Sequence, residues 1–137
     1  MRRGAKVLCD AGPLIALYDG QDFANEVCRE ALDQVTGELI TTWPCLTEAF
    51  YFLRNKAGKE RLWELLSSGA LFPENLLSTD LPRMRSLMAK YASLPMDFAD
   101  ASLVVVAERL RLRKVFSLDH DFRVYRPRHI RHFEVFP

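Results

Sequence analysis

Long apolar runs are missing from this chain. The longest, at 14–18 and 103–107, fall far short of the roughly 20 residues that cross a bilayer. Arg2 and Arg3 are not followed by a sustained apolar segment with a small-residue cleavage site, so we expect no signal peptide and no membrane association. A cytoplasmic location is the default expectation.

Paired cysteines and clustered histidines are missing too. Cys9, Cys28 and Cys45 are odd in number and widely spaced, which matches neither a disulfide framework nor a Cys-x-x-Cys motif. We expect them to be buried, reduced thiols. The three histidines show no helical metal-pair spacing backed by a third ligand, which argues against a zinc site.

The bulk composition is that of one globular domain. Of the 137 residues, 49% are hydrophobic and 27% are charged, and no repeat or Gly/Ser-rich linker suggests a boundary within 1–137. The formal net charge is only +1. Basic residues nevertheless gather at 109–114 and 123–131, where they could hold phosphates or form an ordinary solvated face.

Short strand-like segments alternate with helical ones along the whole chain. We expect strands at 6–9, 39–42, 70–72, 114–117 and 133–136. We expect helices at 14–18, 22–35, 44–55, after Gly58, at 80–91 and at 101–110, with Asp22 and Thr42 as caps. This order predicts an α/β fold with a mainly parallel sheet covered on both faces. Ligands bind beyond the carboxyl ends of such strands.

Acidic residues stand where that rule points. Asp10 follows the first strand directly, and Asp119 and Asp121 follow the strand that ends near Ser117. Asp10 alone could equally be a turn residue before Gly12.

A second set of acids belongs to helices. Asp97 and Asp100 stand at the amino end of the apolar helix, where Asp97 is placed to cap it and Asp100 is freer to project into the pocket. Glu48 lies about one turn into the helix that follows the second strand, among apolar neighbours. Taken singly, Asp97 and Asp100 could simply cap a helix, and Glu48 could be an ordinary surface acid.

If these strand and helix ends converge, several like charges share one pocket. Such charges repel unless they are protonated or neutralised by a cation. Carboxylate oxygens suit Mg²⁺ or Mn²⁺. A centre of this kind activates water and binds phosphate oxygens, so it predicts phosphodiester hydrolysis.

Four segments together resemble the PIN-domain family. They are VLCDAGPLIALYD, TWPCLTEAFYFL, MDFADASLVVVAERL and VFSLDHDF. Each resembles one PIN motif, and they follow in the family's order across almost the whole chain. Their combination is therefore specific, although no single segment is.

The resemblance implies a three-layer α/β/α domain with an acidic Mg²⁺ or Mn²⁺ site. By position, the catalytic and metal-binding acids are Asp10, Glu48, Asp100 and Asp119, with Asp97 and Asp121 in support. Gly12 stands where many relatives have Ser or Thr, and Ser117 is a candidate substitute for that hydroxyl.

The resemblance also implies an RNA endonuclease of the VapC toxin type. Such toxins act as homodimers and are inhibited by a cognate antitoxin whose carboxy-terminal segment fills the site. We take Arg54, Lys56, Arg123 and Arg126 as candidate RNA contacts. Favourable charge near a helix carboxyl end explains Arg54 and Lys56 equally well.

Two other functions fit parts of the sequence. A PIN-like module with a weakened site could bind RNA or protein without cutting, although all four principal acids are present. A phosphoacceptor or phosphatase with an aspartyl nucleophile would also place Asp10 after the first strand. It requires an Asp at position 12 and a lysine after a late strand, whereas Gly12 is there and Lys114 precedes its strand.

Overall fold

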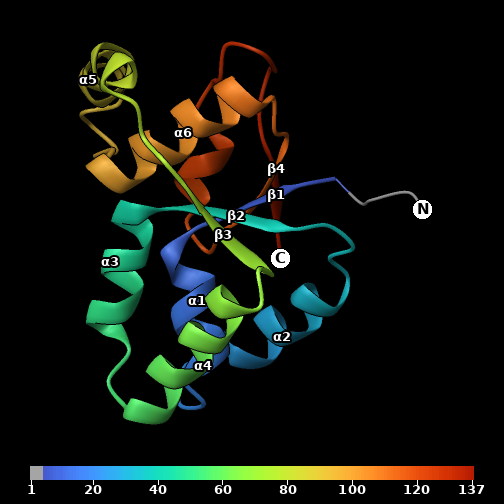
Figure 1. The fold of residues 1–137 in the computed structure, drawn as a ribbon. Coiled ribbons are helices and arrows are strands. Elements are labelled where there is room, and N and C mark those ends of the chain that lie inside the picture. The colour runs from blue at the N-terminus through green and yellow to red at the C-terminus, as the bar shows by residue number, and fades with distance from the viewer. Residues whose placement is uncertain (1–4) are drawn as a thin grey trace.

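The computed structural model describes residues 5–137, so Arg2 and Arg3 lie outside the described part. Its centre is a sheet in the order β3-β2-β1-β4-β5, with every neighbouring pair parallel. The strands are β1 (Val7–Cys9), β2 (Leu39–Thr42), β3 (Leu71–Glu74), β4 (Lys114–Phe116) and β5 (Glu134–Phe136). The predicted parallel sheet is confirmed, and all carboxyl ends of the strands share one edge (Figure 1).

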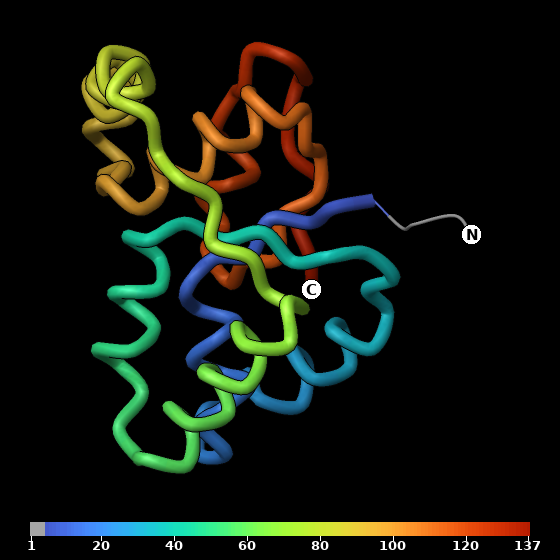
Figure 2. The backbone as a smooth tube through the Cα atoms, in the orientation of Figure 1, coloured from blue at the N-terminus to red at the C-terminus, as the bar shows by residue number. Residues whose placement is uncertain are grey.

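Helices cover both faces of this sheet. They are α1 (Ala11–Tyr18), α2 (Asn25–Asp33), α3 (Trp43–Phe52), α4 (Lys56–Ser67), α5 (Leu81–Lys90) and α6 (Phe98–Leu110). The first four lie on one side and α5 and α6 on the other, as the tube in Figure 2 also shows. The predicted three-layer α/β/α fold is confirmed. None of the helices within residues 5–137 is long and apolar enough to cross a membrane.

Helix α6 contributes a continuous buried segment to the core. Its residues from Ala99 to Ala107 are all buried, because the helix packs between the sheet and α5. Burying a Leu or Val side chain contributes about 1.5–3 kcal/mol, so this apolar segment is a major source of stability. Asp100 and Ser102 are the polar residues within it, and both are hydrogen-bonded.

Several helix boundaries differ from the predictions for local reasons. Thr42 precedes α3, but its hydroxyl pairs with Ser102 at 2.6 Å instead of capping the helix. Asp22 binds the Ala24 amide in a turn before α2. Helix α4 begins at Lys56 because the Asn55 side chain caps it, accepting from the Gly58 amide at 2.6 Å.

Candidate active site

Asp10 joins β1 to α1 and is held from two sides. Its backbone amide donates to the Phe116 carbonyl of β4. One carboxylate oxygen accepts from the Ala11 amide at 2.8 Å, which caps α1, and the other accepts from the Ser117 hydroxyl at 2.8 Å. Asp10 is only 7% exposed. This carboxylate is therefore fixed at the carboxyl edge of the sheet, between β1 and β4.

Asp97 and Asp100 form a reciprocal cap at the start of α6. The Asp100 amide donates to Asp97 Oδ1 at 2.8 Å, and the Asp97 amide donates to Asp100 Oδ2 at 3.3 Å. The Tyr125 hydroxyl donates to the same Asp100 oxygen at 3.2 Å. The structure thus places Asp97 as the cap residue and Asp100 as the buried carboxylate of the first turn.

Ser117 links Asp10 to the acids that follow β4. Its hydroxyl oxygen accepts from the Asp119 amide at 3.0 Å while the hydroxyl binds Asp10. Asp119 then caps the short 3-10 helix His120–Arg123, accepting from the Asp121 amide at 2.9 Å. One buried hydroxyl thereby sets the positions of two strand-end acids.

The acids are close enough to perturb one another's ionisation. Burial raises the pKa of Asp10, and the charges of Asp119 and Asp97 raise it further. Burial, then the charges of Asp97 and Asp10, raise the pKa of Asp100 to about 8. The same three causes, in the same order, raise the pKa of Glu48 to about 7. Side chains from β1, α3, α6 and the end of β4 therefore share one electrostatic site.

The donor chemistry of this site fits a hard divalent cation. All its candidate ligands are carboxylate oxygens, which Mg²⁺ and Mn²⁺ prefer. The ion pairs found within residues 5–137 involve Arg83 and Arg109 and leave these acids without a basic partner. The described part of the chain has no ready-made group of three ligating side chains.

Two neighbours of the acids escaped the sequence analysis. Tyr125 is fully buried, yet it belongs to an arginine-rich segment with no periodicity to signal a buried ring. Cys45 places its thiol 3.9 Å from Asp10 Oδ1. A signal for Cys45 did exist, since a spacing of three residues puts it on the same helix face as Glu48.

The predicted RNA-contacting residues fall into two groups. Arg123 lies in the 3-10 helix beside Asp121, and Arg126 donates to the carbonyls of Arg123, Val124 and Tyr125. Both are exposed close to the acids in sequence. Arg54 is exposed between α3 and α4, and Lys56 is exposed at the first position of α4, so both follow the carboxyl end of α3. Lys56 starts α4 and does not belong to the helix of Glu48.

Two hollows in the surface lie away from the acids. One, of about 700 Å³, is lined by α2 together with parts of β1, β4 and β5. The other, of about 510 Å³, lies between α5, the end of α6 and residues 128–129. Neither is lined by Asp10, Glu48, Asp100 or Asp119.

No family profile matches the chain, but known proteins similar to it along nearly its whole length include a ribonuclease and a toxin. The chain is 24% identical over 135 residues to Ribonuclease VapC26 of Mycobacterium tuberculosis, an alignment that spans 96% of this chain and all of that protein. The crystal structure of M. tuberculosis VapC20, a sarcin–ricin loop cleaving toxin, superposes with a TM-score of 0.78 at 16% identity. That superposition covers 91% of this chain and 98% of the other.

The chain is thus similar in sequence to a VapC ribonuclease and shares its fold with a VapC toxin. Gly12 lies in the first turn of α1, two residues after Asp10, so the hydroxyl that the resemblance implies at this position is missing. Ser117 is hydrogen-bonded to both Asp10 and the Asp119 amide and remains the candidate substitute for that hydroxyl.

Proposed function

We propose that this protein is a Mg²⁺- or Mn²⁺-dependent endoribonuclease, the toxin of a toxin–antitoxin pair, with residues 1–137 acting as one cytoplasmic domain. VapC26 is named a ribonuclease and VapC20 a toxin that cleaves the sarcin–ricin loop. The alignment with VapC26 covers both proteins almost end to end, which supports transfer of the general activity. The alignment does not identify the RNA that this protein cleaves.

One observation carries the metal dependence. Asp10 and Asp100 are buried carboxylates whose pKa values are raised, first by burial and then by the charges of neighbouring acids. Buried like charges are costly unless a cation compensates them. Asp10, Asp100, Glu48 and Asp119 would hold the ion. Once bound, it would bind phosphate oxygens and lower the pKa of a water.

The chain's own residues would position the metal ligands and contact the RNA. Ser117 and the Ala11 amide fix the two oxygens of Asp10, so this ligand is preorganised. The Tyr125 hydroxyl and the Asp97 amide orient Asp100. Burial and the charges of Asp97 and Asp10 raise the pKa of Glu48 to about 7; a cation held by these acids would lower it and favour the charged carboxylate. Asp97 and Asp121 support the ligands, and Arg123 and Arg126 contact the RNA backbone.

The proposed partners follow from the toxin assignment. They are an RNA substrate, a cognate antitoxin and a second copy of the chain in a homodimer.

The test is digestion of total RNA by the purified protein with Mn²⁺, with Mg²⁺ and with EDTA. We expect discrete fragments that EDTA abolishes, and their loss in Asp100→Asn, which keeps the size of the side chain. Asp33→Asn makes the same change on the exposed end of α2 and should cleave like the parent. Cleavage by Asp100→Asn at the parental rate would refute the assignment. RNA binding with no cleavage under any condition would indicate the binding module instead.

A further inference from the structure

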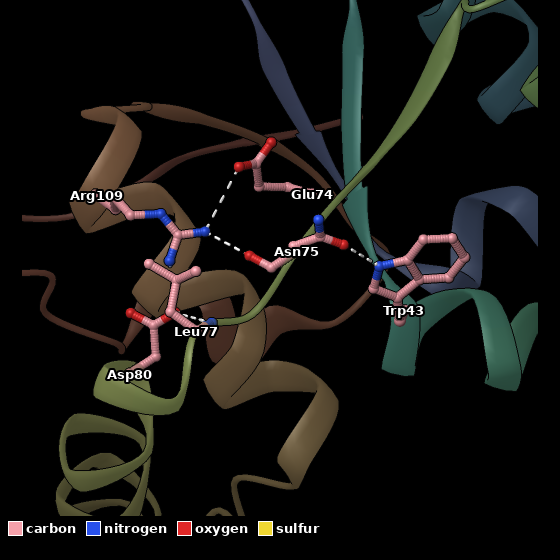
Figure 3. A network of polar contacts seen from close by, with 6 residues as sticks. All are labelled: Trp43, Glu74, Asn75, Leu77, Asp80 and Arg109. Carbon is pink, nitrogen blue, oxygen red and sulfur yellow. Dashed lines mark hydrogen bonds and ion pairs between the residues drawn. The ribbon is translucent and has the colours of Figure 1, made fainter.

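An exposed indole lies at the same edge of the sheet as the acids. Trp43 is the first residue of α3 and is 52% exposed. Its one polar atom is already satisfied, because Nε1 donates to Asn75 Oδ1 at 2.8 Å (Figure 3). The exposed part of the ring is therefore apolar surface held in one orientation.

A polar network beyond Asn75 fixes this orientation. The backbone carbonyl of Asn75 accepts from the Arg109 guanidinium, which also binds Asp80 and lies 3.6 Å from Glu74 (Figure 3). The Leu77 amide donates to Asp80 at 2.9 Å. The segment after β3 is thus tied to the end of α6. Because Arg109 is flanked by two carboxylates, its charge is neutralised, and the rim offers an aromatic face instead of a free cation.

Short contacts tie the start of α3 to the acids. Thr42, the residue before Trp43, bonds to Ser102 of α6 at 2.6 Å. Cys45, two residues after it, lies 3.9 Å from Asp10 Oδ1. Successive helical residues are turned by about 100°, so two residues that are two positions apart point to nearly opposite flanks of the helix. The side chain of Trp43 therefore leaves α3 on the flank opposite Cys45. The indole therefore lies beside the segment that follows β3, at the edge of the sheet that also carries Asp10.

We propose that Trp43 binds a nucleobase of the RNA substrate by stacking, at the edge of the sheet that carries the acids, and that Asn75 and Arg109 are positioning residues for the indole. This inference rests on the proposed ribonuclease function. Every base has a π-face, so such stacking can anchor a single strand whatever its base sequence. The acids would then act on the backbone while the indole holds a base of the same strand.

The test measures Trp43 fluorescence directly. Trp63 is the other tryptophan, on α4, so Trp63→Phe leaves Trp43 as the sole reporter and also serves as the matched aromatic control. This protein is titrated in EDTA, to prevent cleavage, with oligoadenylate, oligouridylate and an abasic oligomer of equal length. Binding of fluorescein-labelled oligoadenylate is measured in parallel.

We expect both base-bearing oligomers to quench Trp43 and the abasic oligomer not to. Trp43→Ala should weaken binding of the labelled oligomer about tenfold, and Trp43→Phe should restore most of it. Asn75→Leu should lower the fluorescence anisotropy of Trp43 and raise KM for the labelled RNA with Mn²⁺ while kcat stays unchanged.

Two outcomes would overturn the inference, and they differ. If the labelled oligomer binds the parent and Trp43→Ala equally and Trp43 is not quenched, the stacking role is wrong and the nuclease stands. If the parent neither binds nor cleaves any RNA with Mn²⁺, the ribonuclease function fails and the stacking role fails with it.

Discussion

The metal-free protein should lose stability as the pH rises through neutrality, and Asp100 should cause much of that loss. The pKa of this carboxyl moves from 3.8 to about 8 in the folded protein, through burial and the charges of Asp97 and Asp10. Between these two values the folded state keeps a proton that the unfolded state has released. Stability therefore falls as pH rises across that window and levels off above about pH 8.

The magnitude follows from one bound proton. Each pH unit within the window costs about 1.4 kcal/mol, so a rise from about pH 5 to about pH 8 removes about 4 kcal/mol of unfolding free energy. That is a large share of the roughly 5–15 kcal/mol of a typical domain. Burial also raises the pKa of Glu48 to about 7, which adds a loss of the same sign up to about pH 7.

Urea denaturation in EDTA at a series of pH values measures this effect. Asp100→Asn removes the ionisation and should flatten the slope by about one proton, whereas Asp33→Asn on the exposed end of α2 should leave the slope unchanged. Saturating Mn²⁺ should restore the stability of the parent at about pH 8. An unchanged slope in Asp100→Asn would refute the reasoning.

Three further substitutions test the parts of the site separately. Ser117→Ala removes the hydroxyl shared by Asp10 and the Asp119 amide; titration calorimetry should show Mn²⁺ binding about tenfold weaker, and unchanged affinity would contradict the positioning role of Ser117. Tyr125→Phe removes the hydrogen bond to Asp100 and should cost about 1 kcal/mol in urea melts; a more stable variant would count against that bond. Gly12→Ser places a Cβ 3.6 Å from Leu118 Cβ, which is an ordinary contact. Circular dichroism should therefore show a folded protein with a free energy of unfolding within about 1 kcal/mol of the parent. Loss of the fold would show that the turn requires glycine.

The sequence predicted that the acids gather because each acid had a local reason for its place. Asp10 follows a buried strand, and Asp97 stands where a helix needs a cap, so both positions follow from short-range rules. The parallel sheet then brings the strand ends together. The identity of the cap and the proximity of the acids were therefore within reach of the chain order alone.

Contacts between distant segments were beyond that reasoning. Thr42 has the right residue type and position for a cap, yet its hydroxyl binds Ser102, which packing alone brings near. Tyr125 reaches Asp100 across 25 residues from a segment whose arginines indicate solvent. The bond from Trp43 to Asn75 likewise depends on how β3 lies beside β2, which no periodicity encodes.

Anomalous diffraction from crystals soaked in Mn²⁺ at about pH 8 tests the central claim most directly. The account predicts a manganese peak bound by Asp10 and Asp100, with Glu48 or Asp119 drawn in, and no such peak in Asp10→Asn crystals. No peak at these carboxylates in the parent, or an unchanged peak in the variant, would contradict it.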